Sequence, residues 1–278
     1  MPTFANETIQ FHYLEKGSGV PFFFQHGLGA DVSQPFGLFQ PTPGIRLIGM
    51  DARAHGQTAP AGPREKIGFV TFADDLVALM DFLNIHKAIV GGISMGAAVA
   101  LNLALRYPNR VLGLVFSRPA WLDGPNPWNV RMFSLVSRLI REHGSRRGQE
   151  FFKETREYAE LLQTYPDTAN SLVRQFEHPQ AEENAVNLEG IPHDTPSPDR
   201  RDWARINVPT LVLANRQDPI HPFEYGELLA QAIPGAEFQE ITSKSISAEQ
   251  HGRDVQGFIE SFLQRHFLLT ERLDKFHE

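Results

Sequence analysis

The apolar positions of the first third of the chain follow two periods. Residues 9–13 alternate apolar and polar side chains, which is typical of a strand with one solvated face. Residues 72–83 instead place apolar side chains on one helix face, with Thr71 and Asp74 positioned to form a capping box at its start. Four further runs are almost continuously apolar and predict buried strands: 20–24, 45–50, 87–93 and 111–116. Strands that alternate with helices in this way predict a mostly parallel sheet covered on both faces, an α/β fold.

This alternation stops near Pro119 and resumes at residues 209–213. Between the two points we find amphipathic helical patterns interrupted by prolines and no convincing strand. A helix, a strand and a final helix follow the resumption. The sequence therefore predicts one α/β core made of residues 1–118 and 206–278, interrupted by a helical cap at residues 119–205.

Composition narrows the class of protein without identifying it. The 278 residues are 41% hydrophobic, enough for a full core, and the formal net charge of −7 argues against nucleic acid or an anionic membrane as the main partner. Because the chain has no cysteine, disulfides and thiolate metal sites are excluded. We find no signal-peptide pattern and no apolar stretch long enough to cross a membrane, so we expect a soluble cytoplasmic protein.

Residues 90–98 carry the strongest functional motif. The apolar run Ala88-Ile89-Val90 leads into Gly92-Ile93-Ser94-Met95-Gly96, and a helix rich in small residues follows. Gly-x-Ser-x-Gly between a strand and a helix is the nucleophile-elbow pattern, in which a sharp turn exposes the serine oxygen above the sheet edge. The N-terminus of the following helix supplies unpaired N–H groups where negative charge would develop. Ser94 is therefore a candidate nucleophile.

Together these residues resemble the α/β-hydrolase superfamily over nearly the whole chain. The resemblance is closest to the group of lidded esterases, lactonases and cofactor-free haloperoxidases. The segments that carry it are His26-Gly27-Leu28-Gly29, Asp51–Gly56, the elbow at Ser94, Asp218–Pro222 and His251. The family order of nucleophile, acid and histidine along the chain is kept.

The resemblance implies a catalytic triad. Ser94 would be the nucleophile, His251 the base that activates it, and Asp218 the acid that orients the histidine. Asp123 is a rival for the acid, because some relatives place the acid after the preceding strand. We prefer Asp218, since Asp123 lies in a Gly-Pro turn that favours aspartate on its own.

The same resemblance assigns the backbone N–H groups of Leu28 and Met95 to an oxyanion hole. His26 is then a structural residue that braces the oxyanion loop, and His55 orders a neighbouring turn. His221 is so close to Asp218 in sequence that we expect it to shape the acid loop.

The helical cap is the candidate substrate-binding region. Any one of its apolar side chains is more simply explained by packing, but an apolar pocket wall would use several of them. The candidates are Trp121, Trp128, Met132 and Phe133. We interpret three arginines of this region as a solvated face: Arg146, Arg147 and Arg174.

The sequence thus predicts a serine hydrolase that acts on a small-molecule ester, lactone or related acyl substrate, with no metal and no organic cofactor. A serine at the elbow leaves carbon–carbon bond hydrolysis and perhydrolysis open. A ligand-binding receptor or scaffold with vestigial turnover is the alternative from another class, because one fold can serve many functions.

Overall fold

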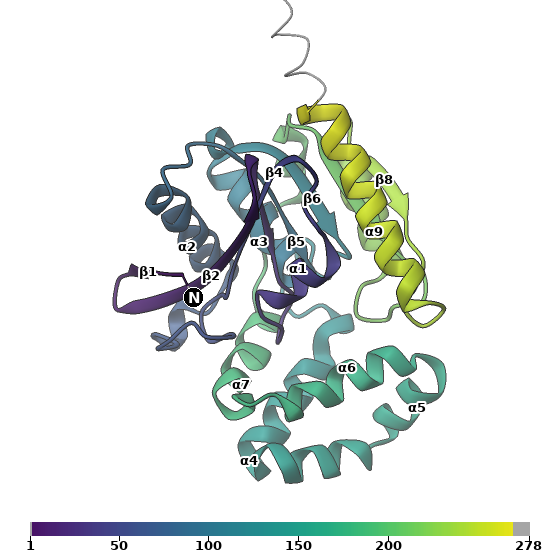
Figure 1. Cartoon of the computed structure of the whole chain (residues 1–278). Coiled ribbons are helices and arrows are strands. Elements are labelled where there is room, and N and C mark those ends of the chain that lie inside the picture. The colour runs from purple at the N-terminus through teal and green to yellow at the C-terminus, as the bar shows by residue number, and fades with distance from the viewer. Residues whose placement is uncertain (1, 269–278) are drawn as a thin grey trace, which may run out of the picture.

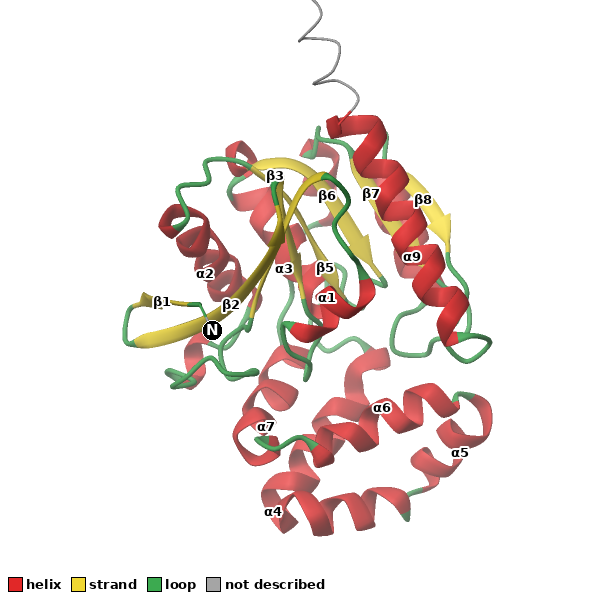
Figure 2. Cartoon of the chain, in the orientation of Figure 1, coloured by secondary structure: helices red, strands yellow, loops and turns green. Residues whose placement is uncertain are grey.

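The computed structural model describes residues 2–268 and contains a single eight-stranded sheet (Figures 1 and 2). Met1 and residues 269–278, which belong to the two predicted core segments, lie outside the described residues. The strands are β1 (Thr3–Asn6), β2 (Ile9–Gly17), β3 (Gly19–Gln25), β4 (Gly44–Met50), β5 (Ala88–Ile93), β6 (Val111–Ser117), β7 (Thr210–Ala214) and β8 (Glu237–Glu240).

Their spatial order is β1-β2-β4-β3-β5-β6-β7-β8. The pairs β1–β2 and β2–β4 are antiparallel, and every pair from β4 to β8 is parallel. The predicted α/β fold with a mostly parallel sheet is therefore confirmed. The carboxyl ends of the parallel strands meet at one edge, where sites in such sheets are found.

Alternation along the buried strands divides the core into two layers. Phe22 and Phe24 of β3 point to one face and Phe23 to the other, because successive strand side chains face opposite sides. Helices α1 (Ser33–Leu38) and α9 (Ala248–Leu263) cover the first face. The second face is covered by α2 (Phe69–Phe82), α3 (Met95–Arg106) and α8 (Phe223–Ala232).

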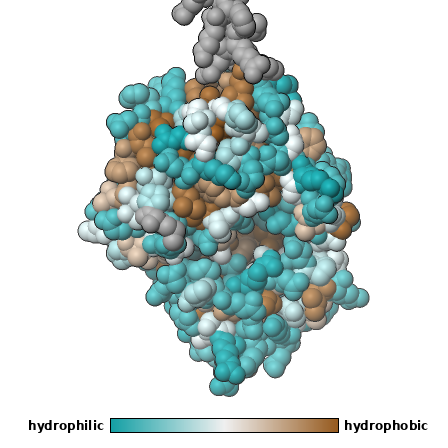
Figure 3. Space-filling view, in the orientation of Figure 1, coloured by the Kyte–Doolittle hydropathy of each residue, from teal (hydrophilic) through white to brown (hydrophobic). Residues whose placement is uncertain are grey.

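The segment between β6 and β7 contains helices throughout its regular structure and lies across the carboxyl ends of the strands (Figure 1). We refer to α4 (Arg131–Lys153), α5 (Arg156–Thr164), α6 (Pro166–Glu177) and α7 (Ala181–Gly190) as the cap. Helix α4 is kinked at Gly144, whose φ of 76° is a conformation that glycine adopts readily. On the face shown in Figure 3, hydrophobic surface lies between core and cap.

Helix α2 begins two residues before Thr71, the first residue of the predicted capping box. The prediction of a capping box formed by Thr71 and Asp74 is therefore wrong. The first residue of α2 is Phe69, and the Phe69 N–H donates to Asp194 Oδ2 at 2.6 Å from the loop that closes the cap. Asp74 pairs instead with Arg106. The hydrogen bond from a residue 125 positions away satisfies an N–H group of the first helical turn, as a local capping box would.

Within residues 2–268, no helix has both the length and the apolar character needed to cross a membrane.

Candidate active site

Ser94 lies at the turn between β5 and α3, at the carboxyl edge of the sheet. Its backbone is strained, with φ 57° and ψ −108°. The two flanking glycines allow this turn: a Cβ on Gly92 would lie 2.3 Å from the Gly96 backbone, and one on Gly96 would lie 2.4 Å from the Gln25 carbonyl oxygen. The predicted strand–turn–helix setting of the elbow is present. The turn leaves the Ser94 side chain facing a cavity below the cap.

The backbone N–H groups of Leu28 and Met95 are the predicted oxyanion hole. Met95 is the first residue of α3, and Leu28 lies in the loop after β3 and lines the same cavity as Ser94. Among the described residues, neither N–H group donates to a protein acceptor. Gln34 holds this loop by accepting the Gly27 N–H at 2.7 Å.

Two buried histidines fix the same loop from below. His26 Nδ1 donates to the Gly27 carbonyl at 2.8 Å, and its Nε2 accepts the Ala52 N–H at 3.0 Å. His55 Nε2 accepts the Gly29 N–H at 3.2 Å. Burial lowers the pKa of both imidazoles, so each stays neutral and can act as donor and acceptor at once. His26 contacts the loop as the sequence predicted, whereas His55, which we expected to order a neighbouring turn, bonds both to the Arg53 carbonyl of its own turn and to this loop.

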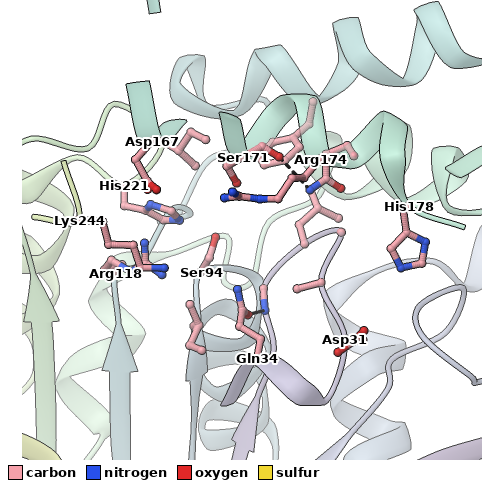
Figure 4. Close-up of a pocket in the computed structure, with 18 of the residues that line it drawn as sticks. Asp31, Gln34, Ser94, Arg118, Asp167, Ser171, Arg174, His178, His221 and Lys244 are labelled. Carbon is pink, nitrogen blue, oxygen red and sulfur yellow. Dashed lines mark hydrogen bonds between the residues drawn. The ribbon is translucent and has the colours of Figure 1, made fainter. Parts of the chain in front are cut away.

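Asp218, the predicted acid, is paired with a histidine that the sequence placed outside the triad. His221 Nδ1 donates to Asp218 Oδ2 at 2.8 Å, and the N–H groups of Ile220 and His221 also point to this carboxylate. His221 Nε2 is buried and has no hydrogen-bond partner among residues 2–268. His221 lines the Ser94 cavity, where Figure 4 shows the ring beside Ser94.

The structure does not join His251 to Asp218 by a hydrogen bond, so the three residues of the predicted triad are not linked in it. His251 lies in the first turn of α9, and its Nδ1 donates to the Thr242 carbonyl at 2.8 Å. The side chain is buried but is not among the residues that line the Ser94 cavity. The carboxylate that would orient it is already occupied by His221, three residues away on the same loop.

The electrostatics of the pair favour a neutral imidazole beside an ionised carboxylate. Burial acts to raise the pKa of Asp218, but the His221 ring and Arg118 outweigh it and hold the pKa far below its ordinary value. Burial lowers the pKa of His221, Asp218 opposes this, and Arg118 and Lys244 lower it further. Burial is also the main cause that lowers the pKa of His251, to about 4. His221 is thus unprotonated at neutral pH, the state that a general base needs.

The cavity that contains Ser94 has a volume of about 490 Å³ and lies between the sheet edge and α6. Three basic side chains face it: Arg118 after β6, Lys244 after β8, and Arg174 on α6 (Figure 4). Arg174, which we predicted to be solvated, is exposed and also lines this cavity.

The four apolar pocket candidates lie in three different places. Phe133 lines the Ser94 cavity. Trp128 and Met132 line a second cavity of about 290 Å³, which shares Ile220 with the first. Trp121 lies in neither cavity: it is 1% exposed and packs edge-on against Phe69, with 5.4 Å between ring centroids. The interpretation of these aromatic residues as packing is correct for Trp121.

Asp123, the rival acid, lies away from the site. Its carboxylate binds the Arg200 guanidinium with two hydrogen bonds of 2.7 and 2.8 Å. The sequence analysis missed two residues of the cavity, Arg118 and Lys244, and it assigned His221 to the acid loop without placing it at the cavity of Ser94. Two features of the sequence could have indicated two of these residues. His221 follows Asp218 by three residues on a loop bounded by prolines, and Arg118 directly follows the strand next to the elbow strand.

Within the described residues, no group of three or more His, Asp or Glu side chains could hold a metal ion.

Comparison with known proteins agrees with this architecture. The family model described as alpha/beta hydrolase fold matches residues 20–247. Among curated proteins, the AB hydrolase superfamily protein YisY of Bacillus subtilis (strain 168) is 28% identical over 252 residues, which cover 84% of this chain and 87% of that protein. The 3-oxoadipate enol-lactonase 2 of Acinetobacter baylyi is 25% identical over 249 residues, 87% of this chain and 88% of the enzyme.

Among solved structures, a thermophilic esterase from Thermogutta terrifontis superposes with a TM-score of 0.71 at 25% identity. The match covers 95% of this chain and 97% of the esterase.

Proposed function

This chain belongs to the alpha/beta-hydrolase family, and from that premise we propose that it is a serine hydrolase that cleaves a small-molecule ester, lactone or related acyl substrate. One observation carries the proposal. The strained Ser94, Leu28 and a neutral His221 line one cavity, Met95 directly follows Ser94, and Asp218 receives the His221 ring. Relatives named as an enol-lactonase and an esterase support the substrate class.

Acylation in this site begins with Ser94. Its hydroxyl proton moves to His221 Nε2 as Ser94 Oγ forms a bond to the substrate carbonyl carbon. The carbonyl oxygen takes up the negative charge and accepts the N–H groups of Leu28 and Met95. The intermediate then collapses, the bond to the leaving oxygen breaks, and His221 gives its proton to that oxygen. Asp218 stabilises the imidazolium while it exists.

Deacylation uses the same groups with water in place of the serine hydroxyl. His221 Nε2 accepts a proton from water, whose oxygen bonds to the acyl carbon. Collapse of the second intermediate breaks the bond to Ser94 Oγ, and the proton returns from His221 to this oxygen. The products are a carboxylic acid and the free enzyme.

The experiment compares three variants by turnover of a short-chain aryl ester and by labelling with a fluorophosphonate probe. Ser94→Ala removes the nucleophile. His221→Asn and His251→Asn form a matched pair, because the amide nitrogen of asparagine can replace Nδ1 while the basic Nε2 is lost. We expect Ser94→Ala and His221→Asn to lose both activities by about 10⁴-fold and His251→Asn to keep them.

Each other outcome has a definite meaning. Loss of activity in His251→Asn but not in His221→Asn would assign the base to His251, as the sequence predicted. Labelling of Ser94 without turnover of esters or lactones would favour a binding protein. Turnover of vinylogous diketones alone would favour carbon–carbon bond hydrolysis. Neither labelling nor turnover in the wild type would refute the serine-hydrolase proposal.

A further inference from the structure

Three basic side chains lie on the side of the Ser94 cavity that contains His221 and Asp218, which we call the acid–base side. The proposed hydrolysis does not need all of this positive charge. Arg118 and Lys244 lie beside Ser94 and His221, and Arg174 reaches in from the cap (Figure 4). None of these three side chains has a role in moving the proton between serine and histidine. A site for neutral esters would not require them.

Arg118 is held beside the nucleophile by the sheet itself. Ile93 of β5 pairs in register with Ser117 of β6, so Ser94 and Arg118 leave adjacent strands at the same level. Arg118 has a φ of 50°, unusual for a residue with a side chain, and is 7% exposed. Backbone strain of this kind is concentrated at functional sites.

The guanidinium of Arg118 is only partly satisfied by the protein. Its nearest carboxylate oxygen, on Asp218, is 3.5 Å away, while Asp218 receives the His221 ring at 2.8 Å. Arg118 Nε is buried and has no hydrogen-bond partner among residues 2–268. A buried cationic donor without an acceptor is costly unless a ligand completes it.

Unlike Arg118, which contacts Asp218, the other two cations are unpaired among the described residues. Neither Lys244 nor Arg174 makes an ion pair or a side-chain hydrogen bond there. Two of the three acidic side chains that line the cavity are occupied elsewhere: Asp31 accepts from the Ser33 N–H and hydroxyl, and Glu177 accepts from Gln149. The third is Asp167, on α6.

Repulsion between the cations lowers the pKa of Lys244. Arg118 is the main cause that lowers the pKa of Lys244 to about 8, followed by burial and then by Arg174. Asp167 and Asp218 oppose this lowering but do not overcome it. An anion between Lys244 and Arg118 would relieve the repulsion and supply the missing acceptor. The charged groups that act on Lys244 are thus two other cations, Arg118 and Arg174, and two anions, Asp167 and Asp218.

We propose that the site selects acyl substrates that carry a free carboxylate, which binds between Arg118 and Lys244 while Arg174 attracts it from α6. The inference rests on the proposed function, because it takes Ser94 as the nucleophile. It adds a class of substrate: small esters or lactones with a free acid group near the scissile bond.

Matched pairs of esters test this preference. In the first pair the carboxylate is on the acyl group: the 4-nitrophenyl monoester of glutaric acid against the same ester with its free acid methylated. In the second pair it is on the leaving group: 4-acetoxybenzoate against its methyl ester. Rates with Ser94→Ala give the background. Because charge-assisted hydrogen bonds are strong, we expect kcat/KM to favour the acid by about 10- to 100-fold in at least one pair.

The ratio of kcat/KM between acid and methyl ester is the readout for the variants. Lys244→Gln should lower this ratio about tenfold, and Arg174→Gln should lower it less because Arg174 is exposed. Arg253→Gln is the matched control. Arg253 is an exposed residue of α9 that pairs with Glu249 and lies outside the cavity, so its loss should leave the ratio unchanged.

Direct binding gives a second readout that needs no turnover. Glutarate should bind the wild type and should bind more weakly above pH 8, where Lys244 loses its proton. Lys244→Gln should abolish this pH dependence. Inorganic phosphate is the comparison anion, and tighter binding of phosphate than of glutarate would overturn the assignment to a carboxylate.

The two proposals can fail separately. A ratio near one with Ser94-dependent turnover would overturn the carboxylate preference and leave the serine hydrolase intact. Absence of Ser94-dependent turnover for all four esters would overturn the proposed function. In that case glutarate decides the anion site: binding that depends on Lys244 would support it, and no binding would overturn it.

Discussion

The two sides of the Ser94 cavity, the oxyanion side and the acid–base side, are formed by different kinds of chemical group. On the oxyanion side, backbone N–H groups of Leu28 and Met95 are held by glycines, by Gln34 and by buried neutral histidines. On the acid–base side, the charged side chains of Arg118, Asp218, Lys244 and Arg174 come from four separate segments and meet only in the folded chain. The first side is fixed by local geometry, whereas the second depends on which partner each charge finds.

This difference predicts how the two sides respond to mutation. Changes on the acid–base side should affect catalysis strongly and stability little, because the charges there are incompletely paired. Changes on the oxyanion side should affect stability first, because its backbone is packed tightly against the sheet.

Asp218→Asn should have the largest effect, a loss of about 10⁴-fold in kcat. The asparagine amide can donate to His221 Nδ1, which then becomes the acceptor and forces the ring proton onto Nε2. That tautomer cannot take the proton of Ser94. Asp123→Asn is the matched control, since Asp123 pairs with Arg200 at the surface. A loss of less than tenfold in Asp218→Asn would contradict an orienting role for this carboxylate.

The contrast also explains which parts of the site could be predicted from the sequence. The elbow at Ser94 and the Leu28 loop follow from short motifs, because glycine spacing dictates the backbone there. The pairing of Asp218 with His221 could not be derived, because two histidines lie within reach of plausible positions and only folding decides which ring the carboxylate receives. Arg174 is exposed as predicted, but its place at the cavity could not be derived, because helical periodicity does not show where a cap helix faces a cavity.

The fold shows the same division. Buried strands such as 20–24 were predictable because two opposite faces must both be apolar. The start of α2 was not, because its cap is Asp194, which comes from a distant loop. Local patterns identify elements, and long-range contacts set their ends.

Gly96→Ala should test the oxyanion side and lower the free energy of unfolding by about 3 kcal/mol. The new Cβ would lie 2.4 Å from the Gln25 carbonyl oxygen, and neither backbone can move without displacing the elbow. Gly257→Ala is the control, because Gly257 is an exposed position of α9 with open space around it. It should stabilise the protein by about 0.5–1 kcal/mol. Equal denaturation midpoints for the two variants would contradict the tight packing.

Asn187→Ala should have a smaller effect, a loss of about 1–3 kcal/mol in unfolding free energy. Asn187 lies on α7 of the cap, and its amide donates to the Ala54 carbonyl at 2.6 Å and to the Arg53 carbonyl at 3.2 Å. These bonds join the cap to the turn that carries His55. Asn207→Ala removes one exposed hydrogen bond and should change the midpoint little. A similar loss of unfolding free energy in both variants would show that the hydrogen bonds between cap and core stabilise the protein no more than an exposed hydrogen bond does.

The smallest effect, and the one that separates the two sides most directly, is a shift in pH dependence. His221 must be neutral to accept the Ser94 proton, so kcat/KM for a neutral ester falls as the pH drops through the pKa of His221. Burial lowers this pKa below 6.5, and Arg118 and Lys244 lower it further, against the opposing charge of Asp218. The acid limb should therefore lie below pH 6.5. Lys244→Gln removes one positive charge, so the limb should move to higher pH by a fraction of a unit. Gln34→Glu adds a charge on the oxyanion side and serves as the comparison. If that variant moved the limb while Lys244→Gln did not, the titrating histidine would not be the one paired with Asp218.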